Sequence, residues 1–142
     1  MEKELLNSGN ELLLKDLCAR LPYGVKCIVK SDGYVGVISS IESQYRVVTF
    51  DDGRQEEICD IKPYLFPLSS MTEEQREEFL NIQTEERQIL LNALIEYKSG
   101  KYDKIPIIAP YKQIEWLNKN HFDYRGLIEK GLSIDCTNLN IY

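Results

Sequence analysis

The sequence predicts an α+β fold in which a small β-barrel is flanked by an N-terminal helix and by a helical C-terminal half that packs on the barrel. Leucines recur at helical spacing over residues 10–21. Short alternating segments separated by turns follow over 25–61. The helical period then returns from residue 69 onward. We therefore expect two regions, 1–68 and 69–142, that together form one compact unit.

The N-terminal helix has recognisable start and stop signals. Asn10 is a suitable N-cap because its side-chain oxygen can accept a hydrogen bond from a free amide of the first turn. Pro22 and Gly24 end the helical pattern. We expect one helix between these signals.

Four or five short strands are expected next, four of them over 25–30, 34–41, 45–50 and 54–61. Asp52 and Gly53 form one of the turns, since this pair accepts positive φ angles. Strands this short are expected to curl into a closed barrel, with Gly36 supplying the bend. Pro63 and Pro67 argue against a central strand over 61–70, so this piece is expected to pack irregularly on the barrel or on the helix that follows.

The second region begins with a capping box, formed by Ser70 with Glu73 or by Thr72 with Gln75, and its helix runs to about residue 83. A second helix, or a continuation of the first, is expected over 84–100, followed by an extended connector over 101–110 and a short helix over 110–120. Asp123 is expected to cap a last helical turn or two.

Composition favours a cytoplasmic protein that does not enter a membrane. No apolar run approaches the roughly 20 residues of a membrane span, and the N-terminus lacks the basic head of a signal peptide. The four cysteines are far apart in the sequence, which indicates reduced thiols. The net charge of −6 disfavours nonspecific nucleic-acid binding.

Motifs for several kinds of chemistry are missing from the sequence. It has no glycine-rich nucleotide loop and no pair of ligands at zinc spacing. We therefore expect no cofactor, no metal and no catalytic residue. His121 is the only histidine, and an enzyme that uses it with Asp123 or Tyr124 stays open as an alternative. A tight structural junction around His121 is the favoured interpretation.

The favoured function is a non-enzymatic interaction module that binds a protein partner. An accessory protein that binds nucleic acid through local basic and aromatic side chains is the alternative, and the sequence leaves the oligomeric state open. Aromatic residues at a barrel rim can bind peptides or bases, although packing of the barrel explains them too. The acidic 69–100 region is a further candidate surface for a basic partner. The candidate binding residues are Tyr34, Tyr45, Arg46, Phe50 and Arg54 at the rim, and His121, Tyr124 and Arg125 at the corner after the last expected helix.

Three stretches carry a resemblance to a known family. They are "LKDLCARLPYGVK" at 14–26, "IKPYLFPLSSMTEE" at 61–74 and "WLNKNHFDYRGLIEKGL" at 116–132. Together they resemble small uncharacterised proteins of gut bacteria and of their phages or mobile elements. The resemblance implies a bacterial intracellular setting and a phage or mobile-element origin, and it implies no catalytic or binding residue. Separately, the strand run over 25–53 is similar in pattern to an SH3-like or Tudor-like barrel.

Overall fold

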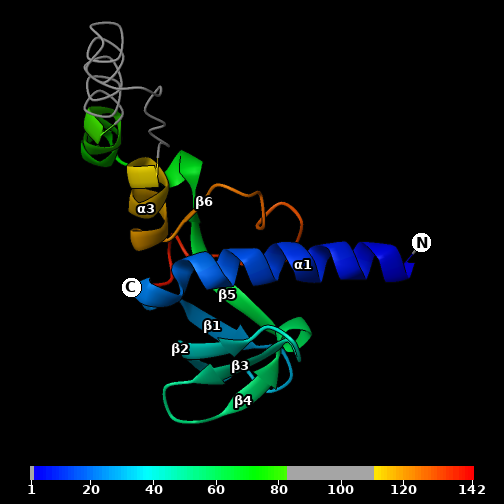
Figure 1. Cartoon of the computed structure of the whole chain (residues 1–142). Coiled ribbons are helices and arrows are strands. Elements are labelled where there is room, and N and C mark those ends of the chain that lie inside the picture. The colour runs from blue at the N-terminus through cyan, green and yellow to red at the C-terminus, as the bar shows by residue number, and fades with distance from the viewer. Residues whose placement is uncertain (1, 83–110) are drawn as a thin grey trace, which may run out of the picture. The chain divides into compact units, whose positions relative to one another are not determined.

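The computed structural model describes residues 2–82 and 111–142 (Figure 1). The chain divides into two compact units, one of residues 1–70 with 118–142 and one of residues 71–117. The helix expected over 84–100 and the connector expected over 101–110 lie outside the described residues. No helix within the two described ranges is long and apolar enough to cross a membrane.

Helix α1 spans Glu2–Arg20, so the prediction that it starts at Asn10 is wrong. Residues 2–6 are mostly strong helix formers, and they extend the helix toward the N-terminus. The predicted end is confirmed, because a short 3₁₀-helix, η1, follows at Leu21–Tyr23 and Gly24 then turns the chain with a φ of 70°.

The first unit contains one mixed sheet of seven strands. Its strand order is β4-β3-β2-β1-β5-β6, and β7 also pairs with β5. The pairs from β4 to β5 are antiparallel, whereas β6 and β7 run parallel to β5. The four strands expected between residues 25 and 61 are confirmed, although the last is shorter than expected. The strands are β1 (Lys26–Val29), β2 (Val35–Glu42), β3 (Val47–Phe50), β4 (Gln55–Glu57), β5 (Ile61–Pro67), β6 (Phe122–Asp123) and β7 (Ile134–Asp135), with 3₁₀-helices η2 (Ile58–Asp60) and η3 (Leu68–Ser70).

The expected SH3-like barrel is wrong, because this sheet is not closed. Among the described residues β4 pairs only with β3, while the far side of β5 is taken by β6 and β7. Helix α1 packs on the sheet and supplies the second layer that closure would otherwise provide (Figure 1). Leu13 and Leu17 of α1 are buried in one core with residues of the strands, among them Val25, Val48 and Leu65.

Strand β5 occupies a central position despite its two prolines, contrary to the expectation of an irregular piece. The amide of Lys30 donates to the Asp60 carbonyl at 2.8 Å, and Pro63 lies opposite Cys27. Along an antiparallel pair only alternate residues direct their polar groups at the partner. The nitrogen of Pro63 therefore points away from β1, toward the side on which the pairing of β5 with β7 begins at Tyr64. Pro63 removes no hydrogen bond from the β1–β5 ladder.

Gly36 allows close packing and does not supply the bend that closure was expected to need. The shift in the β2–β3 register lies further on, between Ile38 and Ser40. A Cβ atom on Gly36 would lie 2.9 Å from a ring carbon of Phe50 and 3.0 Å from one of Tyr34. The two rings can approach β2 this closely only because position 36 has no side chain.

The expectation of a helical C-terminal half is wrong for residues 122–142, which contain β6, a series of turns and β7. The Asp123 carboxylate accepts hydrogen bonds from the amides of Leu127 and Ile128 at 3.0 and 2.9 Å. Gly126 and Gly131 have φ angles of 76° and 72°, which no α-helix contains. Asp123 therefore caps a turn.

A buried ion pair connects α1 to this C-terminal segment. Asp16 and Arg20 have no exposed surface, and the Arg20 Nε atom donates to Asp16 at 2.8 Å. Arg20 also donates to the backbone carbonyl of Phe122 at 2.6 Å. The Nε atom of Arg125 lies 3.3 Å from the other Asp16 oxygen. Burial nevertheless raises the pKa of Asp16, against the lowering effect of Arg20 and Arg125.

The second unit begins with the helix expected after residue 72. The Thr72 hydroxyl accepts from the Gln75 amide and the Gln75 side chain accepts from the Thr72 amide, so the capping box is confirmed. The helix covers 73–82 within the described residues. Helix α3 spans Tyr111–Lys119, and its Trp116 ring lies 5.6 Å from that of Phe79.

We expect the change Arg20→Met to lower the free energy of unfolding by about 3–5 kcal/mol, because it leaves the Asp16 carboxylate buried without its main partner. Urea denaturation measures the change. The double variant Asp16→Leu with Arg20→Met should be more stable than the single variant, since it removes the uncompensated charge. A single variant within about 1 kcal/mol of the original protein would contradict this account.

We expect Gly36→Ala to lower the free energy of unfolding by about 1–3 kcal/mol, because the added methyl group meets two packed rings. Gly9→Ala is the matched control, since Gly9 lies inside α1 and a Cβ there meets Leu132 at an ordinary 3.5 Å. The control should leave stability unchanged or raise it. Thermal denaturation of both variants tests the contrast, and equal effects would show that Gly36 is not needed for packing.

Candidate functional site

An open groove of about 370 Å³ lies in the first unit, beside α1 and next to the ends of β3 and β4. Helix α1, the turn between β2 and β3, and the end of β4 with η2 each contribute to its wall. The lining residues are Asn10, Tyr45, Arg46, Glu57, Ile58 and Cys59. The groove therefore brings together three segments that are far apart in the sequence.

Tyr45 is the most exposed large side chain of the groove, with 70% of its surface accessible. It lies in the turn between β2 and β3. Tyrosine combines a large apolar ring with a polar hydroxyl, and for this reason it is common in binding surfaces. Tyr45 gives the groove an apolar contact surface.

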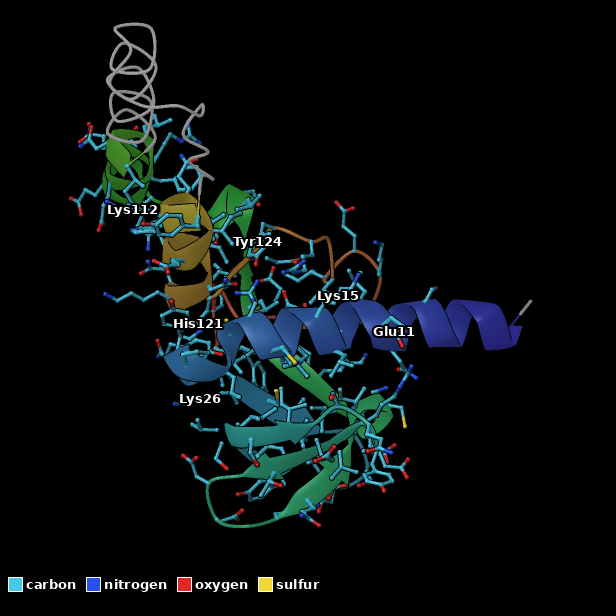
Figure 2. The ribbon with its side chains drawn as sticks, in the orientation of Figure 1. Glu11, Lys15, Lys26, Lys112, His121 and Tyr124 are labelled. Atoms are coloured by element: carbon cyan, nitrogen blue, oxygen red, sulfur yellow. The ribbon has the colours of Figure 1, made fainter. Side chains whose placement is uncertain are left out.

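Arg46 has a backbone φ of 55°, a left-handed conformation that non-glycine residues adopt at a cost. Its carbonyl accepts a hydrogen bond from the Ile58 amide at 2.8 Å, which ties the turn to the start of η2. Its guanidinium group forms an ion pair with Glu11 of α1. Figure 2 shows Glu11 on α1, away from the C-terminal end of the helix, which lies near His121. These contacts fix the backbone beside Tyr45.

Glu57, Cys59 and Asp60 form the acidic side of the groove region. One ligand atom from each lies within 4.8 Å of the others, and all three residues are exposed. Burial raises the pKa of the Cys59 thiol, and a hydrogen bond to Glu57 and the charge of Asp60 add to this effect. A protonated thiol is a weak nucleophile and a poor metal ligand. The two carboxylates give this side of the groove region a negative charge.

Three of the other predicted rim residues form a closed cluster at the opposite turns of the sheet. The Tyr34 ring meets Phe50 edge-on with 5.3 Å between centroids, and its hydroxyl donates to Asp52 at 2.6 Å. The Arg54 guanidinium lies 4.5 Å from the Tyr34 ring centre and pairs with Asp32. The hydrogen bond from Tyr34 lowers the pKa of Asp52. The ring and the hydroxyl of Tyr34 thus both contact other residues of the same chain.

The three predicted corner residues join the C-terminal segment to α1 and β1. The His121 ring stacks on Tyr142 with a centroid distance of 3.6 Å, and its backbone φ is 63°. Tyr124 donates to the Asn118 side chain at 2.9 Å. The guanidinium groups of Arg20 and Arg125 lie against the Tyr124 ring. Figure 2 shows His121 and Lys26 at the C-terminal end of α1.

Burial lowers the pKa of His121 to about 4, and the positive charges of Arg20 and Lys26 act in the same direction. The Nδ1 atom is buried with no hydrogen-bond partner among the described residues. A second proton on the ring would therefore be poorly accommodated. His121 is neutral near pH 7 and packs as an aromatic ring.

Comparisons with protein-family models, with curated proteins and with solved structures each found no match.

Sequence reasoning found two of the groove residues, Tyr45 and Arg46, and missed the other four. Asn10 was interpreted as a helix cap, although it lies inside α1. Residues 57–59 were assigned to a continuous strand, although the strand ends at Glu57. Consecutive glutamates at 56 and 57 were the available signal, because charged residues are typical of the free edge of a sheet.

We expect the protein to lose stability as the pH falls from 6.5 to 4. The folded pKa of His121 lies below the ordinary value of 6.5, so in this window the unfolded chain binds a proton that the folded chain does not. The loss of folding stability that comes from His121 is on the order of 2 kcal/mol, and there is no such loss above the ordinary histidine pKa.

Urea denaturation at several pH values, with His121→Asn as the comparison, measures this loss. Asparagine tolerates a positive φ but does not titrate, so the stability difference between the two proteins should change over this window. If the free energies of unfolding of the two proteins changed with pH in the same way, the account of His121 as a buried neutral residue would be wrong.

Proposed function

We propose that this protein is a non-enzymatic interaction module whose groove binds a basic segment of a protein partner. The observation that carries the proposal is the exposed Tyr45 ring in a groove of about 370 Å³ beside the Glu57 carboxylate. An apolar ring next to a carboxylate can bind the stem and the charge of a lysine or arginine side chain together.

Charge at the groove supports a basic partner. Arg46 lines it, but its charge is offset by the ion pair with Glu11. Glu57 and Asp60 form no ion pair within the described part of the chain. The whole chain carries a charge of −6, which adds a long-range attraction for cationic segments.

The alternative of nucleic-acid binding has weaker support, because the basic side chains of the strand region are engaged within the chain. Arg54 pairs with Asp32 and Glu56. The ammonium groups of Lys26 and Lys30 donate to the backbone carbonyls of Ile141 and Cys59. A phosphate would have to displace these contacts, and those of Arg46, before it gained any charge contact.

The alternative of an enzyme based on His121 also has weaker support. His121 as a whole residue is 9% exposed, and its imidazole packs against Tyr142. A general base needs to reach a substrate proton.

We also propose that the protein is located in the cytoplasm of a bacterium and originates from a phage or mobile element. The four free cysteines support the location, and the sequence resemblance supports both.

We expect a peptide of about nine residues that alternates Lys and Val to bind at the groove. A titration of the labelled full chain followed by NMR should shift the amides of Tyr45, Arg46, Ile58 and Cys59. Tyr45→Ala should weaken binding at least tenfold, as expected for a central aromatic contact. Added salt should weaken binding as well.

Two controls make this experiment decisive. The same peptide with Glu in place of Lys should not bind, and Tyr111→Ala should bind normally because this exposed tyrosine lies in the other unit. Groove amides that do not move with the Lys peptide, or Tyr45→Ala binding as tightly as the original protein, would overturn the proposal. Saturable binding of a short single-stranded DNA without peptide binding would favour the nucleic-acid alternative.

A further inference from the structure

The free edge of β4 offers a more specific way to hold the basic segment. We propose that the segment binds as an added β-strand along β4, with its side chains running into the groove beside Tyr45. This inference rests on the proposed function, and it adds the conformation and the backbone contacts of the partner.

Backbone geometry shows which groups of β4 are free. The Phe50 amide donates to the Arg54 carbonyl, and the Ile58 amide donates to the Arg46 carbonyl, both at 2.8 Å. Since alternate residues of an antiparallel strand face the same neighbour, Arg54, Glu56 and Ile58 direct their polar groups at β3. The amides and carbonyls of Gln55 and Glu57 therefore point away from it. No described strand pairs with that side of β4.

The groove continues from this edge. Glu57 is the last residue of β4 and also lines the groove. Its backbone is extended, with φ −74° and ψ 147°, so its outward amide and carbonyl have a strand-like orientation. A strand that pairs with Gln55 and Glu57 would pass directly into the space beside Ile58.

Side-chain alternation fits a segment in which basic and apolar residues alternate. Glu57 lies opposite Val47 on the half-buried face of β3, and Glu56 lies opposite the fully buried Val48. A residue of an added strand opposite Glu57 would thus lie beside its carboxylate, and one opposite Gln55 would lie on the same face beside an amide. The intervening residue would lie opposite Glu56, on the face of the sheet that carries the buried Val48, where the Glu56 carboxylate is already paired with Arg54. Lysine suits the first two positions and valine the intervening one.

A second copy of this chain is a poor occupant of the same edge. Pairing β4 with another β4 would bring Glu56 and Glu57 of the two copies close together, and like charges across strands are destabilising. Acidic residues on a short edge strand therefore reject self-association while accepting a basic strand.

The test uses the alternating Lys–Val peptide in two N-methylated forms, one methylated at every Lys amide and the other at every Val amide. The pairs from β4 to β1 are antiparallel, and we expect the same orientation for the added strand. The Lys amides would then face β4, so their methylation should weaken binding at least tenfold. Methylation of the Val amides, which face solvent, should change binding less than threefold.

A pair of variants tests the same contact from the protein side. Glu57→Pro removes the outward amide, and the φ of −74° suits proline, so the fold should be kept. Glu57→Gln keeps the amide and removes only the charge. Proline should weaken binding at least tenfold and more than glutamine does, while urea denaturation confirms that both variants are folded.

The outcomes separate the two proposals. If the unmodified peptide does not bind, the proposed function and the added strand both fail. If it binds at the groove but both methylated peptides bind equally, and Glu57→Pro equals Glu57→Gln, the function stands and the added strand is wrong. A dimer of the protein alone that Glu57→Pro converts to a monomer would assign the edge to a second copy and overturn this inference.

Discussion

The buried guanidinium of Arg20 is the constraint on which much of the first unit depends. A charge without exposed surface must be paired and hydrogen-bonded, because water cannot solvate it. Asp16, one helical turn away, supplies the charge, and the carbonyl of Phe122 supplies a further acceptor. The requirement fixes the end of α1 against β6, although 102 positions separate the two residues in the sequence. It also explains why the corner that contains His121 is packed.

The position of α1 in turn allows the sheet to remain open. A sheet with one apolar face must cover it, either by curling or with another layer. Leu13 and Leu17 provide the other layer, so the strands need not close. An open sheet has free edges, and β4 at one of them is short and carries two glutamates. The same acidic residues disfavour pairing with other copies of the chain, and they are the basis of the basic strand that we propose as the partner.

The candidate site was predictable only in part. Tyr45 stands out as an aromatic residue in a turn, and it remains exposed in the structure. Tyr34 and Arg54 gave the same kind of signal, but they bind each other and neighbouring carboxylates. Nothing local distinguishes these cases, because the difference lies in which turns the sheet brings together. Asn10 could not be assigned to the groove for the same reason, since its role depends on where α1 packs.

The sequence by itself determined the features that depend on near neighbours in the chain. The end of the N-terminal helical segment before Gly24, the capping box of Thr72 and Gln75, and the first four strands all follow from local hydrogen bonds and side-chain periodicity. Only the tertiary structure decided that the sheet is open, that β5 is central in spite of Pro63, and that residues 122–142 add strands and turns. These outcomes depend on contacts between distant segments, whose energies no local pattern encodes.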